Sequence, residues 1–263
     1  MLLSGEKKVI KIGVKLVDIL VFPKNRILCS TSDSLILYDE AIQLIKRLTR
    51  IDDDIFFEPS GMAIDGEENH LYIADTHNRK IIMTDLEFNK IKSIGRIGSG
   101  YEEFFSLAGI CFKNGNLYIC DKCNGRIHIF TKDLQFLNSF RPFEFIFPFY
   151  IRATKSLILV QSSTSPTILY IYKLPDFIWH KKINSVNICL KVSVIDSFFY
   201  RYNYRSESML CYDEDGNFEE EIVLSNLYGN IIHGYNDGQI IELNGKLFMT
   251  SHYEENLIIF SKN

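Results

Sequence analysis

The stretch LYIADTHNRKIIMTD at residues 71–85 recurs, without a gap, as LYICDKCNGRIHIFT at residues 117–131. Asp75 aligns with Asp121 and Asn78 with Asn124, which sets a period of 46 residues. In both copies short apolar runs flank a polar centre, the pattern of two β-strands joined by a loop. A fixed period of this length is typical of propellers, in which each repeat folds as a four-stranded blade.

The same period extends in both directions along the chain. An earlier copy ends at Asp39, and later copies lie at residues 168–172, 210–213 and 257–261. Dipeptides that favour β-hairpins separate strands within the copies, namely Asn114-Gly115, Asp215-Gly216 and Asn244-Gly245. The six copies predict an all-β, six-bladed propeller of four-stranded antiparallel blades.

The repeat also predicts the domain organisation. Residues 39–48 have a helical spacing of apolar residues, but their register in the repeat makes them a turn followed by a strand. We expect the 263 residues to form a single domain. The expected blades are residues 14–50, 51–97, 98–141, 142–184, 185–226 and 227–263.

The last copy is one strand short. Few residues follow Ser261, whereas the strand-like segment 6–13 belongs to no copy. We therefore expect residues 6–13 to supply the outer strand of the last blade. This pairing would close the ring and remove an exposed sheet edge.

The composition is that of an ordinary globular chain, with 46% apolar and 24% charged residues, which excludes disorder. No apolar run approaches the roughly 18 residues of a transmembrane helix, and the start of the chain does not read as a signal peptide. The net charge of −4 disfavours broad attraction to nucleic acid or to anionic lipid. Six cysteines without framework spacing predict reduced thiols in the cytoplasm.

One part of the repeat resembles a known family. Residues 59–65, with the sequence PSGMAID, and the strand pair at 71–81 resemble the NHL repeat, which builds six-bladed propellers. The motif aspartate is Asp75 in blade two and Asp121 in blade three. The other four blades carry different residues there: Cys29, Ser162, Asn203 and Ser251.

The resemblance implies a binding platform. Propellers of this family are often the C-terminal substrate-recognition modules of tripartite-motif RING ubiquitin ligases, and several bind single-stranded or stem-loop RNA on one face. The sequence contains no RING or B-box, because the dense Cys and His ligands of those domains are missing. Calcium-dependent lactonases and amidating lyases are propellers of similar shape, so a metal-dependent hydrolase or lyase is a third alternative.

The sequence predicts no catalytic residues, no metal site and no cofactor. Asp75 and Asp121 recur at one repeat position, which favours a structural role in which each carboxylate accepts backbone N–H groups of the loop that follows. Cys120 and Cys123 form a lone CxxC without the further ligands that zinc requires.

Loops that follow the motif position are expected to emerge together on one face. Their mixed aromatic, basic and acidic residues favour a protein or peptide partner, with RNA as the alternative and with neither DNA nor membrane expected. Phe104, Phe105 and Phe149 are expected to point inward between blades. The candidate binding residues are His77, Arg79, Lys122, Tyr150, Arg152, Tyr202, Tyr204, Arg205 and Tyr253.

Overall fold

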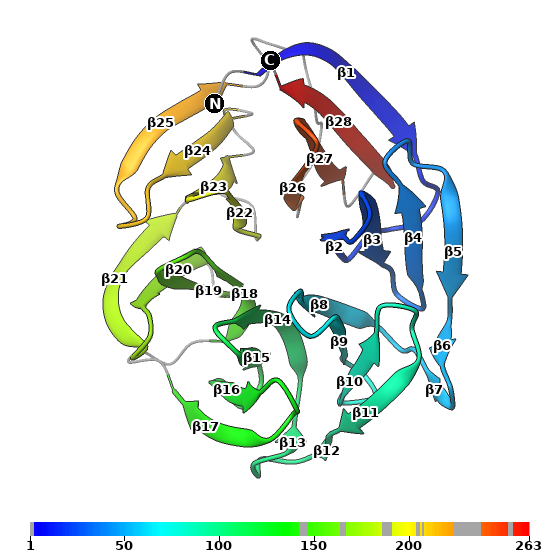
Figure 1. Ribbon diagram of the computed structural model, residues 1–263. Coiled ribbons are helices and arrows are strands. Elements are labelled where there is room, and N and C mark those ends of the chain that lie inside the picture. The colour runs from blue at the N-terminus through cyan, green and yellow to red at the C-terminus, as the bar shows by residue number, and fades with distance from the viewer. Residues whose placement is uncertain are drawn as a thin grey trace.

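The computed structural model describes residues 3–141, 147–163, 167–185, 191–203, 206, 208–223, 238–251 and 255–262. Every regular element in these ranges is a β-strand, and six four-stranded antiparallel sheets are arranged as the blades of a propeller (Figure 1). The predicted fold class is therefore confirmed. Within the same ranges there is no apolar helix with the length needed to cross a bilayer.

Five blades are built from four strands that are consecutive in the sequence, ordered from the channel outward. Blade one contains β2 (Asp18–Phe22), β3 (Arg26–Ser30), β4 (Leu35–Asp39) and β5 (Leu44–Leu48). Blade two contains β8 (Pro59–Asp65), β9 (His70–Asp75), β10 (Lys80–Asp85) and β11 (Lys90–Ile94). Blade three contains β14 (Leu107–Lys113), β15 (Asn116–Asp121), β16 (Arg126–Thr131) and β17 (Phe136–Phe140).

Blade four contains β18 (Pro148–Ala153), β19 (Leu157–Ser162), β20 (Thr167–Lys173) and β21 (Ile178–Ser185). Blade five contains β22 (Ser193–Ile195), β23 (Phe198–Asn203), β24 (Ser208–Tyr212) and β25 (Phe218–Val223). Short strand pairs lie in the loops that follow blades one and two: β6 (Arg50–Ile51), β7 (Asp54–Ile55), β12 (Arg96–Ile97) and β13 (Glu103–Phe104). The segment 39–48 is a turn and a strand, as its repeat register predicted.

The sixth blade joins the two ends of the chain. It contains β26 (Ile240–Leu243), β27 (Lys246–Ser251), β28 (Asn256–Lys262) and, outside them, β1 (Leu3–Lys11). β1 runs antiparallel to β28, with Val9 opposite Ile258 and Ile10 opposite Leu257 (Figure 1). The predicted closure of the ring by the N-terminal strand is confirmed.

The hydrophobic core lies between blades, because successive side chains of a strand point to opposite faces of its sheet. In β9, Tyr72 and Ala74 pack into the core shared with blade three, whereas Leu71 and Ile73 pack into the core shared with blade one. Both faces of a blade are therefore buried. This explains why the middle strands read as unbroken apolar runs instead of alternating patterns.

Two glycines at one repeat position bring the inner strands of neighbouring blades into backbone contact. A Cβ atom on Gly61 of β8 would lie 2.9 Å from the carbonyl oxygen of Ala108 in β14. A Cβ atom on Gly109 of β14 would lie 2.9 Å from the Cα of Tyr150 in β18. A larger residue at either position would force the blades apart, so the sequence uses glycine where they meet most closely.

The repeated aspartate fastens the loop that enters each of these blades. Asp75 is fully buried, and its Oδ1 accepts a hydrogen bond of 2.9 Å from the Phe57 backbone N–H. Its Oδ2 accepts a hydrogen bond of 2.8 Å from Asn78 Nδ2. The same amide group also donates a hydrogen bond of 2.7 Å to the Ile55 carbonyl. The structural role expected of Asp75 is confirmed.

Asp121 repeats this arrangement in blade three. It accepts hydrogen bonds from the backbone N–H groups of Phe105 at 3.1 Å and Ser106 at 3.0 Å, and from Asn124 Nδ2 at 2.6 Å. The expected backbone donors were wrong for both aspartates, because the backbone N–H groups belong to the loop before the blade, and the loop after the aspartate contributes only the Asn78 or Asn124 side chain. The inner strand is antiparallel to the second strand, so its beginning lies beside the end that carries the aspartate.

The two aspartates differ in their electrostatics. Burial raises the pKa of the Asp75 carboxyl, and its few hydrogen bonds do not reverse the effect. Burial acts on Asp121 in the same direction, but contacts from His128, Ser106 and Asn124 together outweigh it and lower the pKa. His128 Nε2 lies 3.5 Å from Asp121 Oδ2, and burial lowers the pKa of this imidazole, so it is neutral at pH 7.

Deletion of residues 1–13 should destabilise the protein, because β28 would become an unpaired edge and the core under Ile10 would be opened. We expect the melting temperature to fall by about 5 °C or more, since about 1 kcal/mol corresponds to about 2–4 °C in a chain of this size. Thermal unfolding followed by circular dichroism measures the change. A truncation of residues 1–2 is the control, and an unchanged melting temperature for the longer deletion would contradict the closure.

The substitution Asp121→Asn should lower the free energy of unfolding at neutral pH by about 1–3 kcal/mol, because it weakens buried hydrogen bonds to a carboxylate. Because the folded pKa of Asp121 is lowered, its contribution is present above the unfolded pKa of about 3.9 and is lost as pH falls through the folded value. The difference between wild type and variant should therefore shrink below about pH 4.

Asp75→Asn is the matched comparison, and its effect on stability should depend on pH in the opposite direction. The folded pKa of Asp75 is raised, so its contribution is greatest at acid pH and is lost as pH rises through the folded value. The difference between wild type and this variant should therefore grow on acidification. Urea unfolding between about pH 3 and about pH 7 tests both variants, and equal pH slopes would refute the contrast.

Candidate functional site: the two mouths of the central channel

The six inner strands run in the same direction along the channel, so the propeller has two chemically distinct faces. We define the top face as the one at which β2, β8, β14, β18, β22 and β26 begin, and the bottom face as the one at which they end. In the part of the chain that the structure describes, the loops between blades and the loops after second strands both reach the top face. The loop cluster predicted from the repeat therefore exists on this face in blades two and three.

A cavity of about 420 Å³ opens at the top face, and we refer to it as the top mouth. Its walls are the first residues of the inner strands and the loops of blades two and three. Its charged and aromatic lining residues are Lys15, Glu58, His77, Lys122, Phe149, Tyr150 and Lys191.

Two lysines of the top mouth lie over aromatic rings. Lys122 Nζ is 5.5 Å from the centre of the Phe149 ring, and Lys191 Nζ is 5.3 Å from the centre of the Tyr150 ring. Lys191 is buried, and its ammonium also donates a hydrogen bond to the Val17 carbonyl. These contacts hold two positive charges at the wall of the cavity through cation–π attraction.

His77 connects the mouth to the surrounding loops. Its Nδ1 lies 2.6 Å from Glu58 Oε2, and its ring centre is 4.4 Å from that of Phe57. Arg79 donates a hydrogen bond of 2.9 Å to the His77 carbonyl, so its guanidinium is held against the same loop. The carboxylate of Glu58 is therefore paired within the mouth.

A charged pair across the channel separates the top mouth from the bottom one. Arg152 in blade four donates a hydrogen bond of 2.8 Å to Asp18 Oδ1 in blade one, on the opposite side of the ring. The same carboxylate accepts a hydrogen bond of 2.8 Å from the Met62 backbone N–H and one of 3.4 Å from the Tyr150 hydroxyl. Burial raises the pKa of the Tyr150 phenol well above its usual range, so it remains a neutral donor.

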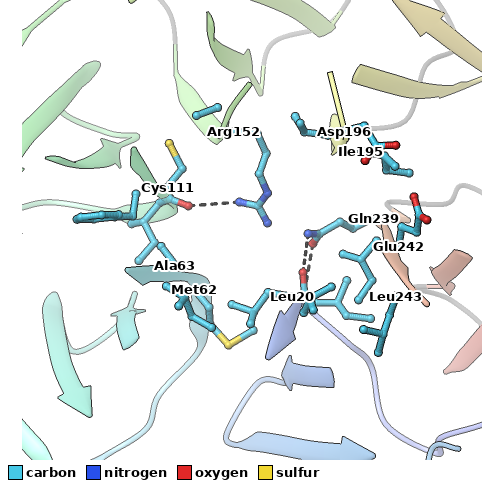
Figure 2. Close-up of a pocket in the computed structure, with 18 of the residues that line it drawn as sticks. Leu20, Met62, Ala63, Cys111, Arg152, Ile195, Asp196, Gln239, Glu242 and Leu243 are labelled. Carbon is cyan, nitrogen blue, oxygen red and sulfur yellow. Dashed lines mark hydrogen bonds between the residues drawn. The ribbon is translucent and has the colours of Figure 1, made fainter. Parts of the chain in front are cut away.

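Below this pair, a second cavity of about 490 Å³ forms the bottom mouth, with contributions from all six inner strands. Figure 2 shows the Arg152 side chain reaching into it and donating to a backbone carbonyl, which is that of Ile110 at 3.3 Å. Two hydrogen bonds to the backbone of Ile19 hold the Gln239 side chain. Its Oε1 accepts from the Ile19 N–H at 3.2 Å, and its Nε2 donates to the Ile19 carbonyl at 2.6 Å. Asp196 and Glu242 add carboxylates to the lining.

The donor set of the channel does not suit a divalent cation. Calcium takes six to eight oxygen ligands, whereas Asp18 is already ion-paired with Arg152. In the described ranges no three His, Cys, Asp or Glu side chains gather as a metal site. Cys120 is buried and Cys123 exposed, and both thiols are free.

The candidate residues from the sequence fall into four groups. His77, Lys122 and Tyr150 line the top mouth, and Arg79 lies beside it. Arg152 forms the channel pair and faces the bottom mouth. Tyr202 is only 2% exposed and packs in the core between blades five and six, so its side chain is not on the surface. The remaining three lie outside the described residues: Tyr204, Arg205 and Tyr253.

Phe57 and Phe105 are exposed surface residues that were not among the candidate binding residues. Each follows a buried phenylalanine, Phe56 or Phe104, and their own side chains are 58% and 51% exposed. The inward orientation expected of Phe104 is confirmed, Phe149 is partly buried, and that expected of Phe105 is wrong. In both pairs the first ring is buried and the second is exposed, so only one of the two successive side chains enters the core. The recurring Phe-Phe pair was the available signal.

Three further lining or channel residues were not predicted from the sequence: Lys15, Asp18 and Lys191. They belong to the residues at or just before the beginning of an inner strand, where the repeat has no shared polar motif. Their proximity depends on the closed ring, because Asp18 and Arg152 are far apart in the sequence and meet across the channel.

Comparison with known proteins supports the repeat and the fold. The family model described as NHL repeat matches residues 106–130, which is blade three from its inner strand to the end of its third strand. No curated protein matches the chain. The NHL repeat predicted from the sequence is thus supported in this blade.

Solved structures with the same fold cover almost the whole chain. A gluconolactonase, XC5397 of Xanthomonas campestris, is 12% identical, with a TM-score of 0.73 over 98% of this chain and 91% of its own. The Cps50 (Swd1) propeller domain of Myceliophteria thermophila is 11% identical, with a TM-score of 0.63 over 98% of this chain and 100% of its own. The WD40 repeats of RRP9 are 8% identical, with a TM-score of 0.65 over 99% of both chains. At these identities the similarity establishes the β-propeller fold alone.

Proposed function

We propose that this protein is a non-catalytic recognition scaffold that binds a protein or peptide partner through the loops of its top face. The observation that carries the proposal is the pair of equivalent, exposed phenylalanines, Phe57 and Phe105. Their backbone N–H groups donate to the buried carboxylates of Asp75 and Asp121, so rigid backbone presents each ring.

Rigid aromatic side chains are effective anchors for a partner. A ring on an already ordered loop buries a large apolar area and loses little conformational freedom on binding. Ile55 and Ile97, in the same two loops, are 63% and 61% exposed and enlarge the apolar surface. Charged residues such as Arg79 and Glu58 surround it, as in the polar rim of a protein interface.

RNA is the alternative partner, and the lysines of the top mouth favour it. Glu58, Glu102 and Glu103 lie in the loops around the same face, however, and their carboxylates would repel a phosphate backbone. The net charge of −4 acts in the same direction. We therefore rank a protein partner first. A metal-dependent hydrolase or lyase ranks last, because Asp18 is neutralised by Arg152.

The resemblance to NHL propellers extends the proposal to two finer points. As the recognition part of a ubiquitin ligase, the top face would bind the protein to be modified, and the catalytic domains would be supplied by another chain or segment. We also propose a cytoplasmic location. The free thiols of Cys29, Cys111, Cys120, Cys123 and Cys211 are compatible with a reducing compartment.

The double substitution Phe57→Ser and Phe105→Ser should abolish partner binding without unfolding the protein. Both rings are exposed, so the free energy of unfolding should change by about 0.5 kcal/mol or less per site. Affinity capture from a cell extract, with quantitative mass spectrometry, compares the proteins retained by wild type and variant.

The matched control is Leu44→Ser with Leu137→Ser, which removes two exposed apolar side chains from outer strands far from the top face. Proteins retained by wild type and by this control, but lost with the phenylalanine variant, are the expected result. Identical protein sets for both variants would refute the proposal. Recovery of RNA in place of protein, with the same dependence on the two phenylalanines, would replace it with the alternative.

A further inference from the structure

We propose that the bottom mouth of the channel binds a small, neutral and mainly apolar molecule, and that a carbonyl group of this molecule accepts hydrogen bonds from Arg152. The inference lies outside the proposed function, which concerns the loops of the top face. Two observations carry it: the chemistry of the cavity wall, and the unused hydrogen-bond donors of a guanidinium that is held in one orientation.

The wall of the bottom mouth is mainly apolar. All six inner strands contribute to this cavity of about 490 Å³. Only five of the described lining residues carry a charge or an amide side chain: Arg152, Asp196, Gln239, Glu242 and Asn244. A cavity of this size, with an apolar wall and a few polar groups that fix orientation, is typical of sites for small molecules.

The guanidinium of Arg152 is held from several sides. Its Nη1 donates to the carbonyls of Ile110 at 3.3 Å and Ile151 at 3.0 Å, and its Nη2 donates to Asp18 Oδ1 at 2.8 Å. Its Cζ lies 4.2 Å from the centre of the Tyr150 ring. The group is therefore already ordered, and a ligand would not have to immobilise it on binding.

This guanidinium retains donors for a ligand. An arginine side chain has five N–H groups. The hydrogen bonds to Ile110, Ile151 and Asp18 use three of them, so within the described part of the chain Nε–H and the second Nη2–H have no acceptor. Figure 2 shows the side chain projecting into the cavity, and 15% of it is exposed. A carbonyl oxygen of a bound molecule would accept from these groups.

The charges of the cavity favour a neutral ligand. Asp18 already pairs with Arg152 at 2.8 Å, so the guanidinium offers donors without a net attraction for an anion. The carboxylate of Asp196 also lines the cavity and would repel a second carboxylate. A carbonyl group would satisfy the donors without carrying a charge into an apolar cavity, which is costly.

The rim confines the apolar surface to the cavity. The turns that join first to second strands surround the bottom mouth, and all of them lie in the described ranges. Apart from Pro23 they contain only polar residues and glycine: residues 23–25, 66–69, 114–115, 154–156, 196–197 and 244–245. A stable protein interface buries a much larger area than the cavity offers, so the geometry favours a molecule that fits inside it.

The first test uses the full chain and two probes of the same shape, the neutral ketone 4-phenylbutan-2-one and the anion 3-phenylpropionate. Saturation-transfer NMR titrations should give the ketone a dissociation constant of about 1 mM or below, which is at least about fivefold tighter than that of the carboxylate. Equal or tighter binding of the carboxylate would overturn the inference, as would no binding of the ketone at about 10 mM.

Val21→Trp should weaken binding of the ketone by about tenfold or more, because Val21 lines the bottom mouth and a larger side chain would fill its opening. The matched control is Val9→Trp on the outer strand β1. The two valines are 40% and 48% exposed, and the control should change the affinity by less than about twofold. Equal affinities of the two variants would place the probe elsewhere and overturn the site.

Arg152→Lys keeps a positive charge beside Asp18 but removes the guanidinium donors. The affinity for the ketone should fall by about fivefold, whereas that for ethylbenzene, which has no acceptor, should change by less than about twofold. Equal changes for both probes would overturn the role of Arg152. If thermal unfolding shows that this variant does not fold, the Val21 and Val9 variants still decide the site.

These results are independent of the proposed function. The probes are directed at the bottom mouth, whereas partner capture is tested through Phe57 and Phe105 on the top face. Failure of the ketone to bind would therefore overturn this inference alone, and loss of the phenylalanine dependence would overturn the proposed function alone.

Discussion

The pairing of β1 with β28 is the constraint on which the rest of the structure depends. A blade buries both of its faces only against neighbours, so an open row would leave two apolar sheet faces in water. Closing the ring in blade six, with one strand from one end of the sequence and three from the other, covers all of them. The same closure brings Asp18 and Arg152 into contact across the channel. It also brings the lysines of the top mouth to one cavity.

The buried aspartates connect stability with the binding surface. Asp75 and Asp121 hold the backbone of the loops that enter blades two and three, and the residues whose N–H groups they accept are Phe57 and Phe105. A structural hydrogen bond therefore fixes the position of an exposed aromatic ring. The motif aspartate therefore supports the proposed binding surface indirectly, by fixing the backbone that carries the exposed ring.

The channel pair gives the two faces different chemistry. Arg152 and Asp18 neutralise each other near the middle of the channel, with Tyr150 above them and Gln239 below. Lysines line the cavity on one side of the pair, and carboxylates such as Asp196 and Glu242 contribute to the cavity on the other. Because the pair satisfies its own charges, the character of each mouth is set by the residues around it.

Periodicity alone determined the six blades, the strand reading of residues 39–48 and the completion of the last blade by the first strand. Each blade is a local hairpin unit, so its pattern is written in consecutive residues. The structural role of the aspartates was also readable, because they recur at one repeat position. The top mouth was readable only in part: His77, Lys122 and Tyr150 were candidates, whereas Lys15 and Lys191 were not, since they share no repeat position and reach the same cavity only when the ring closes. Whether a side chain such as Phe105 or Tyr202 faces solvent depends on packing between blades, and packing was decided by the tertiary structure.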